Sequence, residues 1–258
     1  MAEVVAAGVR TYYAEHGDGP AVVLLHGGMT GGDSWSPQIS ALAERFRVLV
    51  PDRRGHGRTP DVDGPYTYGA MAEETIAFIE QMASGPAHLV GWSDGANVAM
   101  HVARDRPDLV GAVVAIGGNF HHDGLHPGFD EMMSDDPDAP EMAMMRAPYE
   151  ATSPDGAGHW PVFMAKVLEM WANGPTMTVA DLSRITSPVL VMVGDDDCIT
   201  YEHTVTLFES LPHGQLAVIP GTSHLVPMEK PALVNALILD FLADTSTRRW
   251  LPMRFTTV

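Results

Sequence analysis

Short apolar runs alternate along this chain with segments whose apolar residues recur at helical spacing. Continuous apolar runs bounded by turn residues are typical of strands that are buried on both faces of a sheet. These runs are AVVLLHGG, RVLVP, AHLVGW, GAVVAIGG, SPVLVMVG and GQLAVIP. The segments with helical spacing are SPQISALAERF, YGAMAEETIAFIEQMAS, ANVAMHVARD, TYEHTVTLFESLP and PALVNALILDFLADT. Strands that alternate with helices build βαβ units, so the pattern predicts an α/β fold with a mostly parallel sheet and helices on both faces.

Two segments depart from this alternation. Near the N-terminus, Val and Tyr residues lie on either side of Gly8, which predicts a hairpin. Residues 119–181 are rich in Met, His, Pro and Asp, and only HWPVFMAKVLEMWANG has clear helical spacing there. This segment is too long for a simple loop and predicts an inserted cap of short helices. The predicted domains are therefore a core, residues 1–118 and 182–258, and a cap, residues 119–181.

Composition narrows the class of protein. The chain has 258 residues, of which 45% are hydrophobic, as in a globular protein with a sizeable core. Its net charge of −18 repels phosphate backbones and anionic lipids, so we expect no binding to nucleic acid or to a membrane surface. Cys198 is the only cysteine, which excludes an intramolecular disulfide and a cysteine-rich zinc site. The N-terminus lacks a signal pattern and no apolar run could span a bilayer, so we expect a cytoplasmic protein.

The stretch GWSDG places Ser93 between two glycines, directly after an apolar strand and before a helix. A sharp strand-to-helix turn strains its central residue and needs small neighbours, here Gly91 and Gly95. Such a turn lifts the serine side chain above the carboxyl end of the sheet. The context favours a nucleophilic serine over one that only caps a helix.

A serine hydroxyl needs a base, and the base needs an acid that orients it. One later strand ends in GDDD, which supplies Asp195, Asp196 and Asp197, and another ends in GTSH, which supplies His224. These side chains all follow the carboxyl ends of strands, where sites in open α/β sheets form. We therefore expect Ser93 and His224 to act together with one of the three aspartates.

The motifs resemble those of the α/β-hydrolase fold superfamily over nearly the whole chain. The resemblance rests on LLHGG, PDRRGHGRT, GWSDG, GDDD and GTSH, in that order. It implies an α/β-hydrolase fold in which Ser93 is the nucleophile, His224 the base and Asp197 the acid. Related dehalogenases and epoxide hydrolases use an aspartate as nucleophile, so the serine makes their chemistry unexpected here.

The same resemblance implies an oxyanion hole made of two backbone N–H groups. One is the N–H of Asp94, directly after the nucleophile. The other belongs to the loop after LLHGG and is that of Gly28, with Met29 as the alternative. His26 is then a structural hydrogen-bonding residue below the hole.

Asp94 places an anion beside a group that must bind a developing oxyanion, which is unfavourable unless something compensates. Its carboxylate either faces solvent or caps the following helix, pairs with a protein cation, or faces the pocket and pairs with a cationic substrate. The GWSDG motif and the cap helix are similar to valacyclovir hydrolase-like and carboxylesterase members of the superfamily. The similarity to valacyclovir hydrolase-like members implies that Asp94 recognises the α-amino group of amino-acid esters.

Three further side chains, those of Met29, Trp160 and His121, are predicted to contact substrate. Trp171 is a second aromatic residue that either lines the pocket or packs the cap. The residues His121, His122, Asp123 and His126 form a local cluster of metal-ligand types. A cap loop that starts after a strand explains this cluster better, so we expect no metal. No P-loop or G-x-G-x-x-G motif is present, and we expect no nucleotide and no cofactor.

The expected function is a serine hydrolase that cleaves small carboxylic esters through an acyl-enzyme. Its expected partner is a small-molecule ester, and the narrower prediction is a cationic α-amino-acid ester. The same triad serves lactonases, C–C bond hydrolases, acyltransferases and cofactor-free perhydrolases, and these alternatives stay open. An alternative of another class is a ligand-binding protein with this fold and little turnover.

Overall fold

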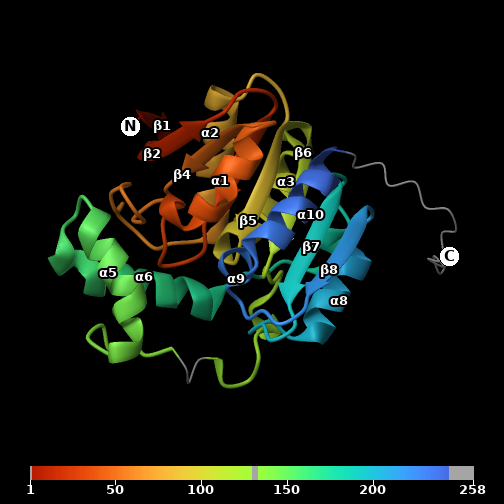
Figure 1. Ribbon diagram of the computed structural model, residues 1–258. Coiled ribbons are helices and arrows are strands. Elements are labelled where there is room, and N and C mark those ends of the chain that lie inside the picture. Colours follow the sequence, from red (N-terminus) through yellow and green to blue (C-terminus); the bar gives the residue numbers. More distant parts are fainter. Residues whose placement is uncertain (1, 130–132, 244–258) are drawn as a thin grey trace, which may run out of the picture.

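The computed structural model describes residues 2–129 and 133–243, and the remainder of the predicted core, residues 244–258, lies outside that part. An eight-stranded sheet with the order β1-β2-β4-β3-β5-β6-β7-β8 runs through the centre (Figure 1). The strands are β1 (Ala2–Ala6), β2 (Val9–His16), β3 (Ala21–Leu25), β4 (Arg47–Pro51), β5 (Ala87–Trp92), β6 (Val110–Ile116), β7 (Val189–Gly194) and β8 (Gly214–Ile219). Strand β2 pairs antiparallel with β1 and β4, and all other pairs are parallel. The mostly parallel sheet predicted from the sequence is confirmed.

The predicted N-terminal hairpin is also present. Ala7 and Gly8 connect β1 and β2 with φ values of 48° and 85°. Two left-handed residues in a row match the twist of a tight hairpin. The register pairs Ala2 with Tyr13 and Ala6 with Val9.

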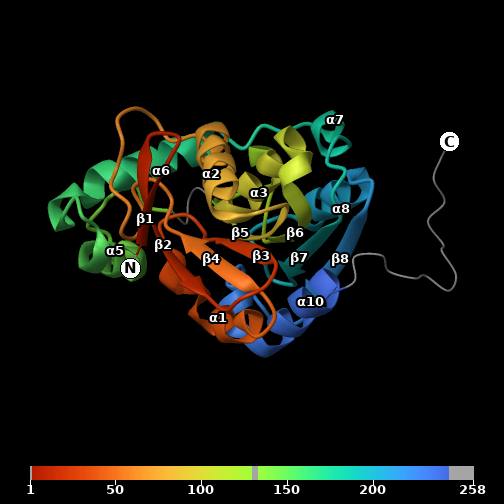
Figure 2. The same ribbon diagram turned by 90° about the horizontal axis from the view of Figure 1, so that it is seen from above.

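Helices cover both faces of the sheet, which buries it on two sides (Figure 2). They are α1 (Ser36–Ala43), α2 (Tyr68–Met82), α3 (Asp94–Asp105), α7 (Val179–Leu182), α8 (Tyr201–Ser210), α9 (Val226–Glu229) and α10 (Pro231–Ala243). Seen from above, α2 and α3 lie on one face, and α1 and α10 lie on the other. Successive residues of β3 alternate between the two faces: Val23 and Leu25 join the core under α2 and α3, whereas Val22 and Leu24 join the core under α1 and α10.

Between β6 and β7 the chain leaves the sheet and forms α5 (Ala143–Thr152) and α6 (Trp160–Asn173), joined by short 3₁₀ turns. These two helices lie together at one end of the sheet (Figure 1). Helix α6 begins with Pro161 in its first turn, where proline is tolerated because the first N–H groups of a helix have no partner inside it. The C-terminal end of α6 reaches the start of α3, because Trp171 contacts Asp94.

No helix in residues 2–129 and 133–243 combines the length and the apolar character that crossing a bilayer requires.

Candidate active site

Ser93 occupies the turn between β5 and α3 with φ 55° and ψ −123°. This backbone conformation is rare for a residue with a side chain and costs roughly 1–3 kcal/mol. The backbone is held in place because Ser93 N–H donates to the Ile116 carbonyl at 2.8 Å. A Cβ added at Gly91 would collide with the Gly95 backbone, and one added at Gly95 would collide with the Leu25 carbonyl. The flanking glycines are thus required by close approach, as the sequence predicted.

The structure brings the predicted Ser, His and Asp side chains together. His224 Nε2 lies 2.9 Å from Ser93 Oγ, and His224 Nδ1 lies 2.7 Å from Asp197 Oδ1. Ser93 follows β5, Asp197 follows β7 and His224 follows β8, so the carboxyl ends of three parallel strands supply the three groups. Trp92 Nε1 donates to the His224 carbonyl at 2.8 Å and fixes the loop that carries the histidine. The geometry is that of a nucleophile bound to a base that is oriented by an acid.

The electrostatics of the histidine and the aspartate favour proton transfer from Ser93. Burial is the largest single effect and raises the pKa of Asp197, but its hydrogen bonds and the charge of His224 together outweigh burial and lower that pKa below its ordinary value. Burial is also the largest single effect on His224 and lowers its pKa, but the hydrogen bonds and charges of Asp197 and Cys198 together outweigh burial and raise that pKa above its ordinary value. An imidazolium is therefore stabilised beside the buried carboxylate once it has formed.

The other two aspartates of the GDDD motif have different surroundings. Both are exposed. Asp195 Oδ1 accepts from the Thr222 N–H at 3.0 Å, and Asp196 N–H donates to the Thr222 carbonyl at 3.0 Å. These contacts hold the turn after β7 against the turn after β8, and neither carboxylate is bonded to His224.

The loop after β3 approaches the nucleophile closely. In the described part of the chain, neither Gly28 N–H nor Asp94 N–H donates a hydrogen bond within the protein. Both N–H groups are therefore free to bind an oxyanion. A Cβ added at Gly28 would collide with Asp94 Oδ2 and would lie 2.6 Å from Trp171 Cζ2, so only glycine fits there. Met29, the alternative, has φ 52° and is only 2% exposed.

A buried arginine supports this loop from below. Arg53 Nη2 donates to the His26 carbonyl at 2.5 Å and to the Gly27 carbonyl at 3.0 Å. His26 Nε2 accepts from Arg53 N–H at 3.0 Å. Burial lowers the pKa of His26 well below its ordinary value, so the imidazole is neutral and acts as an acceptor. His26 has the structural role that the sequence indicated.

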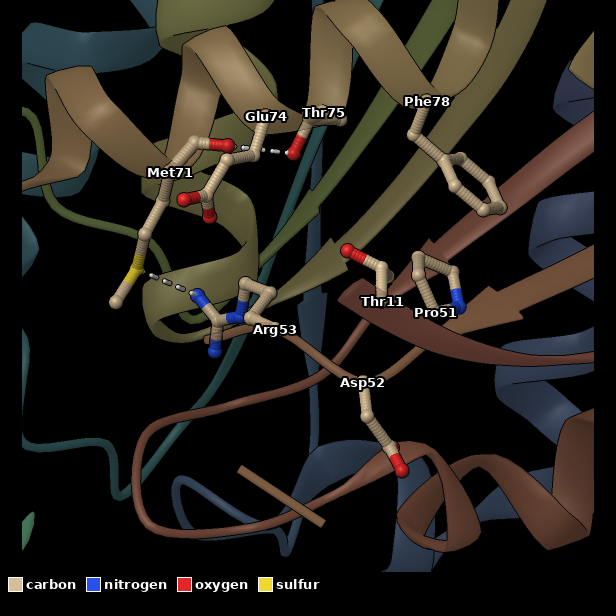
Figure 3. A pocket seen from close by; sticks show the side chains of 8 residues that line it. All are labelled: Thr11, Pro51, Asp52, Arg53, Met71, Glu74, Thr75 and Phe78. Atoms are coloured by element: carbon tan, nitrogen blue, oxygen red, sulfur yellow. Dashed lines mark hydrogen bonds between the residues drawn. The ribbon is translucent and has the colours of Figure 1, made fainter. Parts of the chain in front are cut away.

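Arg53 also lines a small cavity that is separate from Ser93 and His224 (Figure 3). Its walls come from Thr11, Pro51, Asp52, Arg53, Met71, Glu74, Thr75 and Phe78. In Figure 3 the guanidinium points toward Met71, and Nη1 lies 3.9 Å from the Met71 sulfur. The arginine is buried and forms no ion pair in the described part of the chain. Its charge therefore acts mainly on the loop carbonyls and on nearby Asp94.

Asp94 has partners that the sequence did not reveal. The side chain is buried, and Oδ1 accepts from Tyr68 Oη at 2.7 Å. Trp171 Nε1 donates to both carboxylate oxygens, at 3.1 and 3.0 Å. The arrangement in which Asp94 faces solvent or caps the helix is thus not observed. Burial lowers the pKa of Arg53, and the Asp94 charge opposes that shift, so the two groups interact without direct contact.

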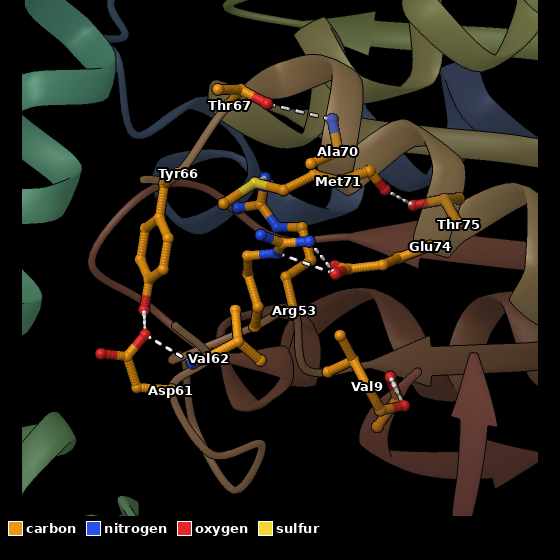
Figure 4. A network of polar contacts seen from close by, with 12 residues as sticks. Val9, Arg53, Asp61, Val62, Tyr66, Thr67, Ala70, Met71, Glu74 and Thr75 are labelled. Carbon is orange, nitrogen blue, oxygen red and sulfur yellow. Dashed lines mark hydrogen bonds and ion pairs between the residues drawn. The ribbon is translucent and has the colours of Figure 1, made fainter. Parts of the chain in front are cut away.

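A second polar network joins the core to the cap. Asp61 accepts from Tyr66 Oη at 2.6 Å and from Val62 N–H at 2.7 Å (Figure 4). From the cap, Lys166 Nζ lies 2.9 and 2.7 Å from the two Asp61 oxygens, and His159 Nε2 lies 2.8 Å away. Burial would raise the pKa of Asp61, but these bonds outweigh it and lower that pKa to about 2.

The three residues predicted to contact substrate have different surroundings. Met29 lines a groove together with Tyr149 and Phe163 of the cap. Trp160 is fully buried, packs against Tyr149 and Phe163, and donates Nε1–H to the Pro137 carbonyl at 3.0 Å. The substrate contact predicted for Trp160 is therefore replaced by a packing role, because no part of its ring is exposed.

His121 lies at the start of a 3₁₀ turn, where Nδ1 accepts from Asp123 N–H at 3.3 Å. Its ring centroid is 4.3 Å from that of His122. Ligand atoms of His121, His122 and Asp123 all lie within 4.8 Å of one another, whereas His126 is outside the group. Contact between His121 and substrate, and the expected absence of a metal there, stay predictions.

The sequence matches the model of the alpha/beta hydrolase family over residues 22–237, and the chain belongs to that family. It is 24% identical to the (E)-2-((N-methylformamido)methylene)succinate hydrolase of Acinetobacter baylyi, over 91% of this chain and 94% of the relative. It is 27% identical to a non-heme haloperoxidase of Rhodococcus erythropolis, over 91% of this chain and 96% of the relative. These matches extend over the cap as well as the core.

Solved structures agree on the fold. The meta-cleavage product hydrolase CumD of Pseudomonas fluorescens superposes with a TM-score of 0.79 and 22% identity. The match covers 94% of this chain and 97% of that one. The protein is therefore a hydrolase of the α/β-hydrolase fold.

Proposed function

We propose that this protein is a serine hydrolase that cleaves small carboxylic esters through an acyl-enzyme. The observation that carries the proposal is the continuous hydrogen-bonded path from Ser93 Oγ through His224 to buried Asp197. Two unused backbone N–H groups lie beside Ser93, that of Gly28 on the loop after β3 and that of Asp94 at the start of α3. Acyl transfer needs these two elements together, a base-activated nucleophile and an oxyanion hole.

Each group has a defined part in the proposed reaction. Ser93 Oγ attacks the acyl carbon while its proton passes to His224 Nε2. The carbonyl oxygen becomes an oxyanion, which the N–H groups of Gly28 and Asp94 bind. The imidazolium gives its proton to the leaving alcohol, and Asp197 stabilises it until then. A water molecule then attacks the acyl-enzyme with His224 again as base, and the scheme requires no cofactor.

The first test is hydrolysis of p-nitrophenyl butyrate by Ser93→Ala beside the parent protein. We expect kcat to fall by at least about 10⁴-fold, as when the nucleophile of a triad is removed. Ser210→Ala is the matched control, because Ser210 lies on α8 and, among the described residues, its hydroxyl bonds only to the Thr206 carbonyl. Turnover that survives in Ser93→Ala at more than a few per cent would remove Ser93 from the nucleophile's role.

A narrower candidate is selectivity for esters of α-amino acids, which rests on Asp94. Its carboxylate has about four acceptor positions, and Oδ2 receives only the indole N–H that it shares with Oδ1. In the described part of the chain no Lys, Arg or His forms an ion pair with Asp94. A substrate ammonium group beside Gly28 would supply the missing positive charge.

The test compares an amino-acid ester with an acyl ester of the same size, in Asp94→Asn and in the parent protein. The amide keeps the acceptor for Tyr68 and removes the charge. We expect KM for the amino ester to rise at least tenfold more than KM for the acyl ester. Equal changes in KM for both esters would leave Asp94 only its structural role as the acceptor for Tyr68 and Trp171.

The same three side chains are suited to other acyl and carbon–carbon bonds, so the alternatives from the sequence keep their own tests. Lactones, vinylogous diketones, a competing alcohol acceptor and hydrogen peroxide with a carboxylate can be offered to the same preparation. A fluorophosphonate that labels Ser93 while every substrate in this panel stays intact would favour a ligand-binding protein with little turnover.

A further inference from the structure

Cys198, the only cysteine of the chain, directly follows the triad acid. Its thiol lies against both members of the acid–base pair. One ligand atom each from Asp197, Cys198 and His224 lie within 4.8 Å of one another. The loop is fixed on both sides of the thiol, because the Cys198 carbonyl accepts from His126 N–H at 2.8 Å and Ile199 N–H donates to Asp197 Oδ1 at 3.2 Å.

The second observation is an unsatisfied carboxylate oxygen at the same place. Asp197 Oδ1 accepts from His224 and Ile199, but Oδ2 is buried and has no N–H or O–H donor in the described part of the chain. The Asp197 side chain is only 1% exposed. A buried carboxylate oxygen without a donor is costly, and a bound cation would satisfy it. Gly117 borders this point, since a Cβ there would lie 3.4 Å from Oδ2 and 3.0 Å from His224 Cε1.

We propose that Asp197, Cys198 and His224 form an inhibitory binding site for a soft divalent cation such as Zn²⁺. The donor set of one sulfur, one imidazole nitrogen and one carboxylate oxygen suits zinc, which binds such atoms at about 2.0–2.3 Å. The three groups need to approach one another by roughly 1 Å to reach that geometry. The fourth position remains for water.

The inhibition follows from the tautomer of the histidine. In the resting triad Nδ1 carries the proton that is donated to Asp197, and Nε2 accepts from Ser93. For a metal to bind Nδ1, the imidazole proton must first move to Nε2, which leaves the Nδ1 lone pair free to bind the metal. Nε2–H cannot accept the proton of Ser93, so general-base catalysis stops. The thiol gives its proton to solvent as it binds, so one proton is released for each metal bound.

The local charge favours a cation at this site. Asp195 and Asp196 are exposed on the same turn, three and two residues before Cys198. The chain as a whole carries a formal charge of −18. A negative surface raises the local concentration of cations and speeds their association. Cys198 is half-buried, so solvent reaches it without unfolding of the loop.

The test uses the full chain, freed of metal with a chelator and kept in a non-coordinating buffer. Binding is followed with Cd²⁺, whose thiolate complexes absorb in the near ultraviolet. We expect one Cd²⁺ per chain and loss of the band in Cys198→Ala. His122→Ala is the matched control, because it removes the other cluster of three ligand types, His121, His122 and Asp123. The absorption band should persist in that variant.

Inhibition is measured in parallel with Zn²⁺ and p-nitrophenyl butyrate. Cys198→Ala should raise the Zn²⁺ concentration needed for half-inhibition at least tenfold, and His122→Ala should leave it unchanged. Equal inhibition of Cys198→Ala and the parent, or no thiolate band in the parent, would overturn the site. The inhibitory effect rests on the proposed function, but binding does not: Ser93→Ala should still show the band. If the Cd²⁺–thiolate band appears in both Ser93→Ala and the parent protein, but the parent has no esterase activity, the metal site stands and only the proposed esterase function is rejected.

Discussion

Gly28→Ala is the sharpest probe of the oxyanion loop. The substitution adds one methyl group and demands no strained backbone, because Gly28 is not among the residues with positive φ. The new Cβ would lie 2.6 Å from Trp171 Cζ2 and would also collide with Asp94 Oδ2. An ordinary carbon–carbon contact is about 3.5–4.0 Å, so the loop or its neighbours must move by roughly 1 Å.

Hydrogen bonds hold both the loop with Gly28 and the side chains that the new methyl group would meet. The loop is held by the bonds from Arg53 to the His26 and Gly27 carbonyls. Asp94 and Trp171 are bonded to each other across the boundary between core and cap. Overpacking of this kind costs about 1–3 kcal/mol of folding free energy. If the Gly28 N–H moves out of place, loss of one oxyanion donor lowers kcat by about 10²–10³-fold, or about 2.7–4 kcal/mol.

The assay measures kcat and KM for p-nitrophenyl butyrate and the free energy of unfolding in urea. We expect kcat to fall by about 10²-fold with a smaller change in KM. Gly69→Ala is the control, since a Cβ there meets nothing within 4 Å and lies in the first turn of α2. That variant should keep full activity and gain a few tenths of a kcal/mol of stability.

A second variant tests the cause of the loss. Gly28→Ala combined with Trp171→Ala removes one of the two colliding groups, so the combined loss should be smaller than the sum of the single losses. A Gly28→Ala protein with kcat within threefold of the parent would refute the reasoning. It would mean that the loop moves freely or that Gly28 N–H binds no oxyanion.

Three further predictions concern strain, pH and the cap. Ser93→Gly should raise the unfolding free energy by about 1 kcal/mol over Ser93→Ala, because glycine adopts φ 55° without strain; equal stability in urea would contradict this. The Asp61 pKa of about 2 is depressed, so its stabilisation is present above about pH 4 and is lost as the pH falls toward 2. Asp61→Asn should therefore lose about 1 kcal/mol at neutral pH and show a flatter stability curve in acid, and parallel curves would count against the network. Trp171→Phe keeps an aromatic ring but removes the N–H to Asp94, so KM should rise more than kcat falls; unchanged kinetics would show that this bond does not matter.

The sequence predicted the sheet, its helices and the approach of Ser93 and His224 to one of three aspartates, and the family resemblance selected Asp197. These inferences succeed because each residue follows a strand, and parallel strands end at one edge of a sheet. The turn from strand to helix at Ser93 was also readable, since an apolar strand precedes it and helical spacing follows it, and the helix starts at Asp94. The apolar pattern locates each strand and helix, and the parallel topology brings the residues after the strands together.

The partners of Asp94 were not readable, because they come from distant parts of the chain. Tyr68 is 26 residues away and Trp171 is 77 residues away. Trp160 and Trp171 are 11 residues apart on α6, about three turns, so periodicity places both on one face. Only tertiary packing, which puts one end of α6 against Tyr149 and the other against Asp94, separates a packing tryptophan from one at the site.

The bond between Trp171 and Asp94 limits which caps could replace the segment between β6 and β7 in this protein. A cap grafted between β6 and β7 without an indole at that place would leave the buried Asp94 carboxylate with one hydrogen-bond donor fewer. Asp94 directly follows the nucleophile Ser93 in the chain. We therefore expect Trp171 of the cap and Asp94 of the core to be kept or changed together. A chimera that preserves Trp171, or changes Asp94 with it, is the design in which a new cap would be compatible with this core.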